Sequence, residues 1–570
     1  MIAGAEAAWR GRRSSAAAPI VRVGRRQSTG VWLAFLGIGA GAFAYLMIRG
    51  RGNIFVYDEW GWIEFRRSGV SSILSSYNDH VLVVPLAVYQ ALFRTVGLGD
   101  YTVYRVLAAL AHLACVAATF EFARRRIGAA ALLIAVPLAF FGPGWEYEME
   151  GVNFGFTLSI ALGIGALLAL DSRGRRADVT ACALLTVGVA FSEFAALFAL
   201  GIAIGQIAAD RNLRRAWIWV VPLVVYGIWW IAYYEPIASQ HDLGAAPKFA
   251  ADMVASAAGG LFGAGLQRGR VILLLIVALI GWRVIRRHAL TPVLITVLVT
   301  AVAFWVLVAV GRDQLNKPWA SHYVYTGAIL LVLVVSESLR GVRIDAKVLA
   351  LAAALAVLSV VGSVRSLRGG EAYLRTASQN VRAELGALRL LGPAAPATLT
   401  LDNLYAPQLI VGPYLAAARM LGPAPTDSPR QLARRPETAR LGADDFLLRA
   451  GELQTRSLPT PVAPAANAPS VEQATNGTTT TSVNCVTFRP DNPSAVVALL
   501  LPPAGLRFQP QPGTGTVIRA RRFATGFDPT PITASTSTSP LTIRSRSDQS
   551  PVPWHIQIAT PRTIRICTPA

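Results

Sequence analysis

Long apolar runs separated by short arginine clusters constrain this chain more than any other feature of its sequence. Val31–Ile48 and Leu290–Val310 are two such runs, and each is long enough to form all or part of a membrane span. Arginines gather between the runs, as in Arg124–Arg126 and Arg173–Arg176, a distribution typical of cytoplasmic loops. Only 15% of the 570 residues are charged, against roughly 25% in soluble domains. The sequence therefore predicts a protein embedded mostly in lipid.

The formal net charge of +21 arises from these same clusters. Strongly basic chains are often nucleic-acid binders, but here the arginines alternate with apolar runs and form no single patch. We therefore exclude nucleic acid and predict a multi-pass protein of the plasma membrane. The basic N-terminus, residues 1–30, is expected in the cytoplasm. The Ala-, Arg- and Gly-rich composition favours a bacterial origin.

Turning the chain at each arginine cluster gives about 11 transmembrane helices within residues 31–363. This count treats the run 81–97 as a helix on the outer membrane face, because Pro85 and Arg94 interrupt it; a full span is the alternative. The first outer loop then comprises residues 50–102. Every strongly basic loop falls on the cytoplasmic side in this arrangement.

The composition changes after the last apolar run, where Pro, Thr, Ser and Ala become frequent. Residues 364–482 are predicted to be an extracytoplasmic linker region. Strand-like alternation within 483–570 predicts a small β-rich extracytoplasmic domain, in which Cys485 and Cys567 can pair if this part is outside the cell. The predicted fold class is thus an all-α polytopic membrane protein with a small β-rich C-terminal domain.

Unusual polar residues collect in the loops that this topology places outside. They are Asp58, Glu59, Asp79, His80, Glu146, Glu148, Glu150, Glu193, Arg312, Lys317 and His322. Carboxylates beside a membrane are costly unless they face water, protein or substrate, so we expect a polar cavity at the outer boundary. For Asp58 and Glu59 a solvated loop is the alternative, because Trp60 and Trp62 also fit an interfacial aromatic belt. Arg105 either snorkels or faces an anionic headgroup.

A series of short motifs runs through the first outer loop and its flanks. In chain order they are the pair Asp58-Glu59, Asn78-Asp79-His80, Pro85-Leu86, Gly97-x-Gly99, Tyr104-Arg105 and Arg124-Arg125-Arg126. Together they resemble the GT-C superfamily of membrane glycosyltransferases, over about residues 31–130. Gly311-Arg312 followed by Ser321-His322-Tyr323 is more weakly similar to a stretch of bacterial members, which usually have Arg where this chain has His322.

The resemblance implies a donor sugar carried on a polyprenyl phosphate and an acceptor outside the membrane, whether an envelope glycan, a lipid or a protein. It also implies a carboxylate in the first outer loop that deprotonates the acceptor hydroxyl in one inverting displacement. Asp58 is the first candidate and Glu59 the second. Adjacent helical residues point about 100° apart, so only one faces the acceptor.

A departing phosphate needs cationic or metal stabilisation. The residues expected to bind substrate or phosphate are His80, Arg105, Glu193, Arg312, Lys317 and His322. The clustered carboxylates permit a divalent metal without requiring one, and no residue is assigned as a metal ligand. A transporter or flippase of a lipid-linked glycan is the first alternative, although it should show charges near the bilayer midplane and often repeats. A non-catalytic membrane scaffold is the second.

Overall fold

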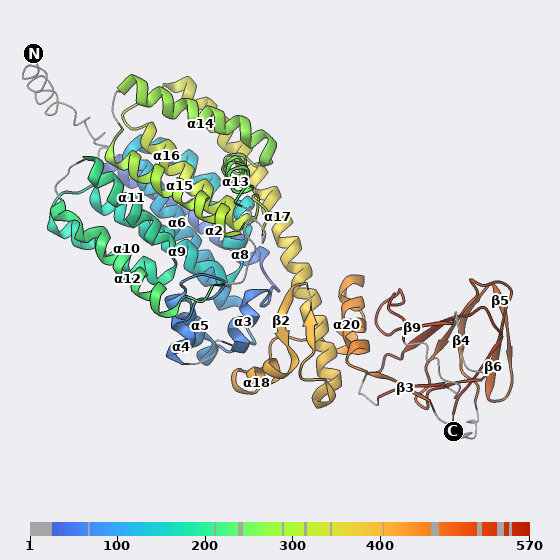
Figure 1. The fold of residues 1–570 in the computed structure, drawn as a ribbon. Coiled ribbons are helices and arrows are strands. Elements are labelled where there is room, and N and C mark those ends of the chain that lie inside the picture. The colour runs from blue at the N-terminus through green and yellow to red at the C-terminus, as the bar shows by residue number, and fades with distance from the viewer. Residues whose placement is uncertain are drawn as a thin grey trace, which may run out of the picture. The chain divides into compact units, whose positions relative to one another are not determined.

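The protein was analysed as a computed structural model that divides into two compact units (Figure 1). The first unit comprises Met1–Arg51, Ser68–Leu92 and Thr102–Tyr373, and the second comprises Gly52–Arg67, Phe93–Tyr101 and Leu374–Ala570. The structure describes residues 25–65, 69–209, 213–236, 243–287, 290–312, 316–342, 345–402, 404–457, 467–509, 516–532, 541–546 and 550–569. Most of the basic N-terminal segment 1–30 therefore lies outside the described residues.

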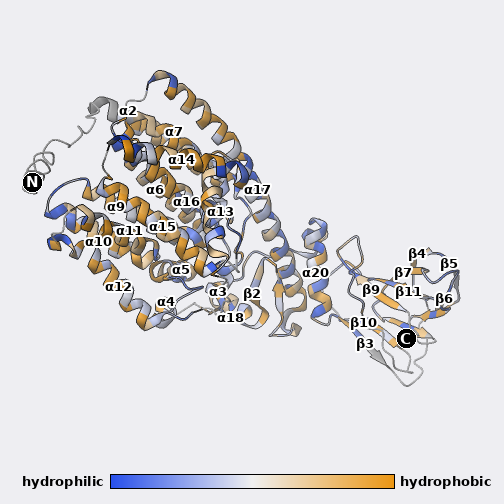
Figure 2. Cartoon of the chain, turned by 45° about the horizontal axis from the view of Figure 1, so that its top comes forward, coloured by the Kyte–Doolittle hydropathy of each residue, from blue (hydrophilic) through white to orange (hydrophobic). Residues whose placement is uncertain are grey.

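Helices form the first unit. They are α2 (Arg25–Arg49), α4 (Val70–Leu74), α5 (Val83–Thr95), α6 (Thr102–Ile127), α7 (Leu132–Ala139), α8 (Trp145–Met149), α9 (Phe154–Leu170), α10 (Arg175–Phe191), α11 (Phe194–Ala209), α12 (Trp217–Tyr233), α13 (Ala246–Gly260), α14 (Gly265–Arg287), α15 (Pro292–Arg312), α16 (Ser321–Ser338) and the start of α17 (Ala346–Leu391). Apolar residues dominate most of these helices, as Figure 2 shows. Side chains that face lipid or a dry helix interface are apolar because polar groups there would lose their hydration.

The chain is a multi-pass membrane protein. Six described helical stretches are long and apolar enough to cross a bilayer, namely Thr29–Arg49, Thr102–Ala139, Gly151–Leu170, Pro292–Arg312, Ser321–Ser338 and Ala346–Ala394. Two shorter apolar helices, α11 and α12, have 16 and 17 residues, below the roughly 20 that an untilted span needs. The predicted count of about 11 spans is therefore not confirmed. The run 81–97 forms α5, which has 13 residues.

The helical segment that follows the Arg124-Arg125-Arg126 cluster is short and broken. A 3-10 turn at Gly128–Ala131 precedes α7, which has eight residues and contains Pro137. The chain then turns back along α6, since His112 Nε2 lies 3.4 Å from the carbonyl oxygen of Ala139. His112 is also 2.9 Å from the Tyr325 hydroxyl through Nδ1. His112 is thus fully buried, and each of its ring nitrogens has a hydrogen-bond partner.

Helix α16 is the most enclosed of the candidate spans, with 89% of its apolar window buried, whereas α17 has 11%. This contrast places α16 in the core of the first unit and leaves the apolar part of α17 facing outward. Large side chains such as Phe120, Phe198 and Phe304 fill the space between the central helices.

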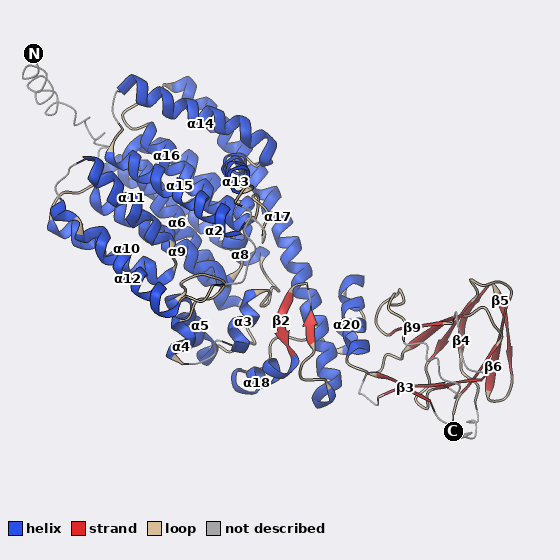
Figure 3. Cartoon of the chain, viewed as in Figure 1, coloured by secondary structure: helices blue, strands red, loops and turns tan. Residues whose placement is uncertain are grey.

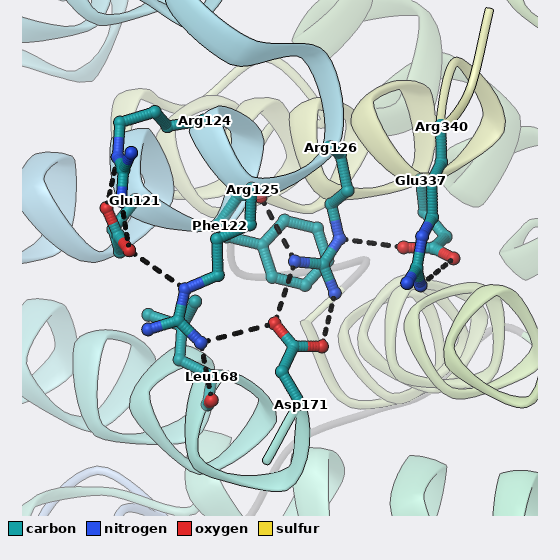
Figure 4. A network of polar contacts seen from close by, with 9 residues as sticks. All are labelled: Glu121, Phe122, Arg124, Arg125, Arg126, Leu168, Asp171, Glu337 and Arg340. Atoms are coloured by element: carbon teal, nitrogen blue, oxygen red, sulfur yellow. Dashed lines mark hydrogen bonds and ion pairs between the residues drawn. The ribbon is translucent and has the colours of Figure 1, made fainter. Parts of the chain in front are cut away.

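A buried ion-pair network joins the ends of α6, α9 and α16 (Figure 4). Arg126 in the last turn of α6 donates from Nε to Glu337 at 2.7 Å and from both terminal nitrogens to Asp171 at 3.1 Å. The side chains of Arg126 and Glu337 are 2% and 0% exposed. Glu337 also accepts from the Thr291 hydroxyl at 3.0 Å. Three helix ends are thereby held by one guanidinium.

Replacing Arg126 by Met should destabilise the first unit by about 3–5 kcal/mol, because the buried Glu337 carboxylate loses its closest cationic partner and is left with Arg340 at 3.5 Å. The double variant Arg126→Met/Glu337→Leu removes both charges and should recover much of that loss. The stability of each variant is measured by heating the protein in detergent and recording the temperature at which monodisperse protein is lost. A double variant no more stable than the single one would contradict a role for uncompensated charge.

The second unit incorporates part of the first outer loop. Helix α3 (Asp58–Phe65) packs against strand β2 (Ala406–Ile410) and helix α18 (Val411–Leu421), and β2 pairs with β1 (Thr400–Asp402). The Ile410 amide donates to Glu64 at 2.9 Å. Trp60 and Trp62 are fully buried in this layer. The alternative of an interfacial aromatic belt is therefore wrong for these two residues.

Residues 364–482, for which the sequence predicts a linker, hold much regular structure. They contain the second half of α17, β1, β2, α18, α19 (Pro429–Leu432), α20 (Glu437–Arg449), β3 (Leu453–Ser457), β4 (Val471–Thr475) and β5 (Gly477–Thr481). Helices α18, α19 and α20 have 11, 4 and 13 residues, so their apolar faces are too brief to stand out beside membrane-length runs. Packing within the second unit stabilises these helices, and the local sequence alone does not predict it.

Two antiparallel sheets form the C-terminal part of the chain (Figure 3). The larger has the order β3-β10-β8-β12-β6-β5, with β10 Leu541–Ser545, β8 Leu506–Gln509, β12 Ile564–Cys567 and β6 Cys485–Pro490; the smaller has the order β4-β7-β11-β9, with β7 Val496–Leu500, β11 His555–Ala559 and β9 Val517–Arg521. The β-rich C-terminal region is confirmed. Cys485 and Cys567 face each other on neighbouring strands and form the disulfide that the sequence allowed.

A buried carboxylate closes the turn between β1 and β2. Oδ1 of Asp402 accepts from the amides of Leu404 and Tyr405 at 2.6 and 2.8 Å. Asp402 is 5% exposed, and this burial raises the pKa of its carboxyl above the usual range, although the two amides and Arg449 oppose the shift. The Asp402 oxygen therefore stabilises the turn as a hydrogen-bond acceptor, while its buried negative charge destabilises the folded state.

Asp402→Asn keeps the acceptor and removes the charge, so it should stabilise the second unit at neutral pH. Because the folded pKa lies above the unfolded value of about 3.9, stability from this group is present at low pH and falls as pH rises through the folded pKa. The advantage of Asp402→Asn should vanish near pH 3 and grow toward neutrality. Asp402→Ala removes the acceptor as well as the charge, so it should be about 0.5–2 kcal/mol less stable than Asp402→Asn at any pH, as for a lost cap. Thermal denaturation of the three proteins across pH measures this.

Candidate functional site

A tight turn in the first outer loop places two of the singled-out residues. Asn78 and Asp79 have positive φ angles of 51° and 66°. Tyr77 and His80 flank them and exchange two backbone hydrogen bonds of 3.1 and 3.0 Å. Positive φ at both central residues is the geometry of a type I′ turn, for which Asn and Asp are favoured. The motif Asn78-Asp79-His80 is therefore a defined turn with sparsely populated backbone angles, a feature common at functional sites.

Arg312, the last residue of α15, holds this turn. Its guanidinium donates to the Asn78 carbonyl oxygen and lies 3.6 Å from an Asp79 carboxylate oxygen. The other Asp79 oxygen accepts from the Tyr234 hydroxyl at 3.3 Å. The side chains of Arg312 and Asp79 are 16% and 22% exposed, so the ion pair is sheltered yet still reachable from solvent.

His80 is held between a carboxylate and this guanidinium. Its Nδ1 lies 2.7 Å from Glu193, whose other oxygen accepts from the Ser192 hydroxyl at 3.0 Å. Its Nε2 lies 3.3 Å from Arg312. A guanidinium only donates, so Nε2 must accept, and the proton must sit on Nδ1 facing Glu193. We infer this tautomer from the hydrogen-bond pattern. A carboxylate-oriented imidazole with an unprotonated Nε2 is suited to accept a proton.

A second histidine–carboxylate pair lies near the first. His322, in the first turn of α16, bonds through Nδ1 to Glu146 on α8. Tyr147 stacks on Phe156 with ring centroids 5.8 Å apart, and His80 meets the edge of Phe156 at 4.9 Å. Tyr147 also stacks on His322 at 6.4 Å. Aromatic rings thus connect the two pairs.

We call this set the polar cluster. Its members are Asp79, His80, Glu146, Glu193, Arg312 and His322. They come from the turn 77–80, α8, the residue before α11, the end of α15 and the start of α16. The arrangement combines proton-accepting groups with a sheltered guanidinium, so it is equipped to bind an anion and to move a proton. Among the described residues no group of three or more His, Cys, Asp or Glu is arranged to hold a metal ion.

The acidic pair that opens the first outer loop lies in the second unit, at the N-terminus of α3. Glu59 is fully buried and accepts the Tyr101 hydroxyl at 2.9 Å on both oxygens and the Val56 amide at 3.2 Å. Asp58 is half-buried, with Gln408 Nε2 3.4 Å from its Oδ1. Glu59 is thus committed to holding the loop, and Asp58 is the more accessible acid.

Two of the predicted phosphate ligands have other surroundings. Arg105 is 7% exposed, and its guanidinium donates to the carbonyl oxygens of Leu46 and Met47, so it caps the last turn of α2. The Lys317 side chain is exposed, and its Nζ lies 5.8 Å from the Trp319 ring.

Sequence reasoning placed Glu146 among the outer polar residues but did not include it among the expected substrate ligands. The signal that points to it is positional, because it precedes a candidate span by only a few residues and so stays near the helix ends. The aromatic residues Tyr147 and Phe156 gave no signal at all, since aromatic side chains are common in any apolar helix.

The chain matches no protein-family model and no curated protein sequence. Among solved structures it is similar to ArnT from Cupriavidus metallidurans, in two crystal structures. The one bound to undecaprenyl phosphate has 15% identity and a TM-score of 0.43, over 70% of this chain and 90% of ArnT. The apo structure has 16% identity and a TM-score of 0.45, over 75% and 92%.

The inferred tautomer of His80 can be measured by nitrogen NMR of histidine-labelled protein in detergent. The chain has 6 histidines, and the His80 signals are those lost in His80→Gln. We expect a protonated Nδ1 and an unprotonated Nε2. Arg312→Met removes the donor to Nε2 and should allow both tautomers, whereas the control Lys317→Gln should change nothing. A protonated Nε2 in the unaltered protein would show that Arg312 does not set the tautomer.

Proposed function

We propose that the protein is a membrane glycosyltransferase of the GT-C type. It moves a sugar from a polyprenyl-phosphate donor to an extracytoplasmic acceptor, which is an envelope glycan, a lipid or a protein. The observation that carries the proposal is the turn formed by Asn78-Asp79-His80, a motif of the resemblance, held by Arg312 and Glu193. A sheltered cation beside an oriented histidine is typical of functional sites and is not required to hold a short turn.

On the donor side, Arg312 supplies the main phosphate contact. Its present partner Asp79 is 3.6 Å away and partly exposed, and a phosphate is a better partner for a guanidinium than a single long carboxylate contact. His80 and His322 belong to the same polar cluster, and His80 Nε2 lies 3.3 Å from this guanidinium. The polyprenyl chain would lie along the apolar helices, whose outward side chains include Val224, Ile228 and Ile231.

On the acceptor side, Asp58 is the proposed base. The acceptor oxygen attacks the anomeric carbon and its proton passes to the Asp58 carboxylate. The bond from that carbon to the phosphate oxygen breaks, and the polyprenyl phosphate leaves with the electron pair. One displacement inverts the anomeric centre. The burial of Glu59 against Tyr101 leaves it less suited to this step than its neighbour.

The same proposal includes the orientation of the chain. We place the N-terminus, residues 1–30, in the cytoplasm, the transmembrane domain at 31–363, and the remainder outside the membrane; the disulfide Cys485–Cys567 supports an oxidising compartment for the C-terminal part. A transporter is less well supported, because the buried charges of the Arg126 network lie at the ends of helices and not at their midpoints.

Asp58→Asn should reduce sugar transfer at least a hundredfold, since a positioned base contributes about 10²–10⁴ in rate. The assay incubates purified protein with a polyprenyl-phosphate sugar and acceptor extract and measures the release of polyprenyl phosphate. The variant should unfold at an unchanged temperature, because Asp58 is half-buried and the amide of Gln408 is a long 3.4 Å from its Oδ1. Glu59→Gln is the matched comparison, and it should lower thermal stability instead. Full activity in Asp58→Asn would remove this residue from the mechanism.

A further inference from the structure

One face of α17 changes abruptly from apolar to basic. Leu358 and Val361 are 64% and 45% exposed, and the next two positions on the same face, Arg365 and Arg368, are also exposed. The spacing of three and four residues aligns all four side chains along one side of a helix. An exposed apolar stripe on a membrane protein faces lipid tails, so the arginines follow directly where the tails end.

An independent contact fixes the same level in the bilayer. Arg49, the last residue of α2, forms an ion pair of 2.5 Å with Glu371 on α17. The candidate span of α2 is Thr29–Arg49, so Glu371 lies at the level where a neighbouring span ends. At about 1.5 Å of rise per residue, Arg368 and Arg365 lie roughly 4.5 and 9 Å from Glu371 toward the membrane. Arginine side chains at this depth extend outward along the helix toward the headgroup region, where the lipid phosphates lie.

The charges at this level are unbalanced. Arg49 and Glu371 neutralise each other, and Glu371 is 2% exposed. Arg365 and Arg368 have no hydrogen-bond or ion-pair partner among the described residues of the chain. Tyr373, 42% exposed, follows one turn later and is the aromatic type that settles at headgroups. Two uncompensated guanidiniums beside lipid require anionic partners that the protein itself does not provide.

We propose that Arg365 and Arg368 form a binding site for the phosphate headgroup of an anionic phospholipid. The occupant is a lipid of the surrounding bilayer, with its tails along the Leu358–Val361 stripe and its headgroup on the two guanidiniums. Charge complementarity and the level set by Arg49 and Glu371 select this partner. The site is separate from the polar cluster, and it holds whether or not the proposed transferase activity is correct.

A fluorophore on Gly369→Cys reports on this site. Gly369 is exposed, and a side chain there meets no atom within 4 Å. Labelling is selective, because Cys115 and Cys182 are buried and the other two cysteines are joined in the disulfide. The full-length labelled protein is placed in vesicles that contain phosphatidylcholine and phosphatidylglycerol, with a headgroup quencher on one lipid or the other.

The site predicts stronger quenching by labelled phosphatidylglycerol than by labelled phosphatidylcholine. Arg365→Gln/Arg368→Gln should abolish this preference, with roughly a fivefold loss per arginine. Arg389→Gln/Arg419→Gln removes the same charge from two exposed residues of the second unit and should leave the preference intact. Equal quenching by the two lipids, or a preference that survives in the first variant or disappears in the second, would overturn the proposal. Competition by millimolar inorganic phosphate would instead make this a site for the free anion and also overturn it.

Discussion

The need to neutralise charge between apolar helices dominates the first unit. A lone ion in a dry interior is strongly unfavourable, so charged side chains gather where helices end and partners from other helices can reach them. Arg126 meets Asp171 and Glu337 at one end of α16. At the opposite end of the same helix, His322 meets Glu146. The middle of α16 carries only apolar and hydroxyl side chains, as a span requires.

The surroundings of Arg126 and of Arg312 differ in how completely the charges are paired. Around Arg126 the partners are buried and close, and the result is a tie between helices. Around Arg312 the carboxylate is farther away, both side chains are partly exposed, and the adjoining turn has positive φ angles. A polar network with a long ion pair and strained backbone contributes little to fold stability. A bound ligand can supply the hydrogen bonds and charge that such a network lacks. This difference is the physical basis for placing function at the Arg312 end.

Much of the helical part could be predicted from sequence, because apolar length and arginine position report directly on membrane spans. The prediction failed where local pattern is weak. Residues 364–482 were predicted to be a linker, because short helices such as α18 and α20 give no membrane-length apolar run. The pairing of the first outer loop with β2 depends on contacts such as Tyr57 with Tyr405, separated by hundreds of residues. No local rule reveals a contact of that range.

The candidate site shows the same limit at the level of single residues. Residue type and loop position were enough to select His80, Glu193 and Arg312, yet they gave all six proposed ligands equal standing. The net charge of +21 likewise counts arginines without saying which are available. The contacts of each arginine show whether its charge is available. Arg105 donates to carbonyl oxygens at the end of α2, and Arg126 pairs with two carboxylates. Arg312 donates to a turn and can bind a ligand at the same time. Within the described part of the chain Arg365 has no such partner, so its charge is available to the surroundings, which for a residue at this level are lipid.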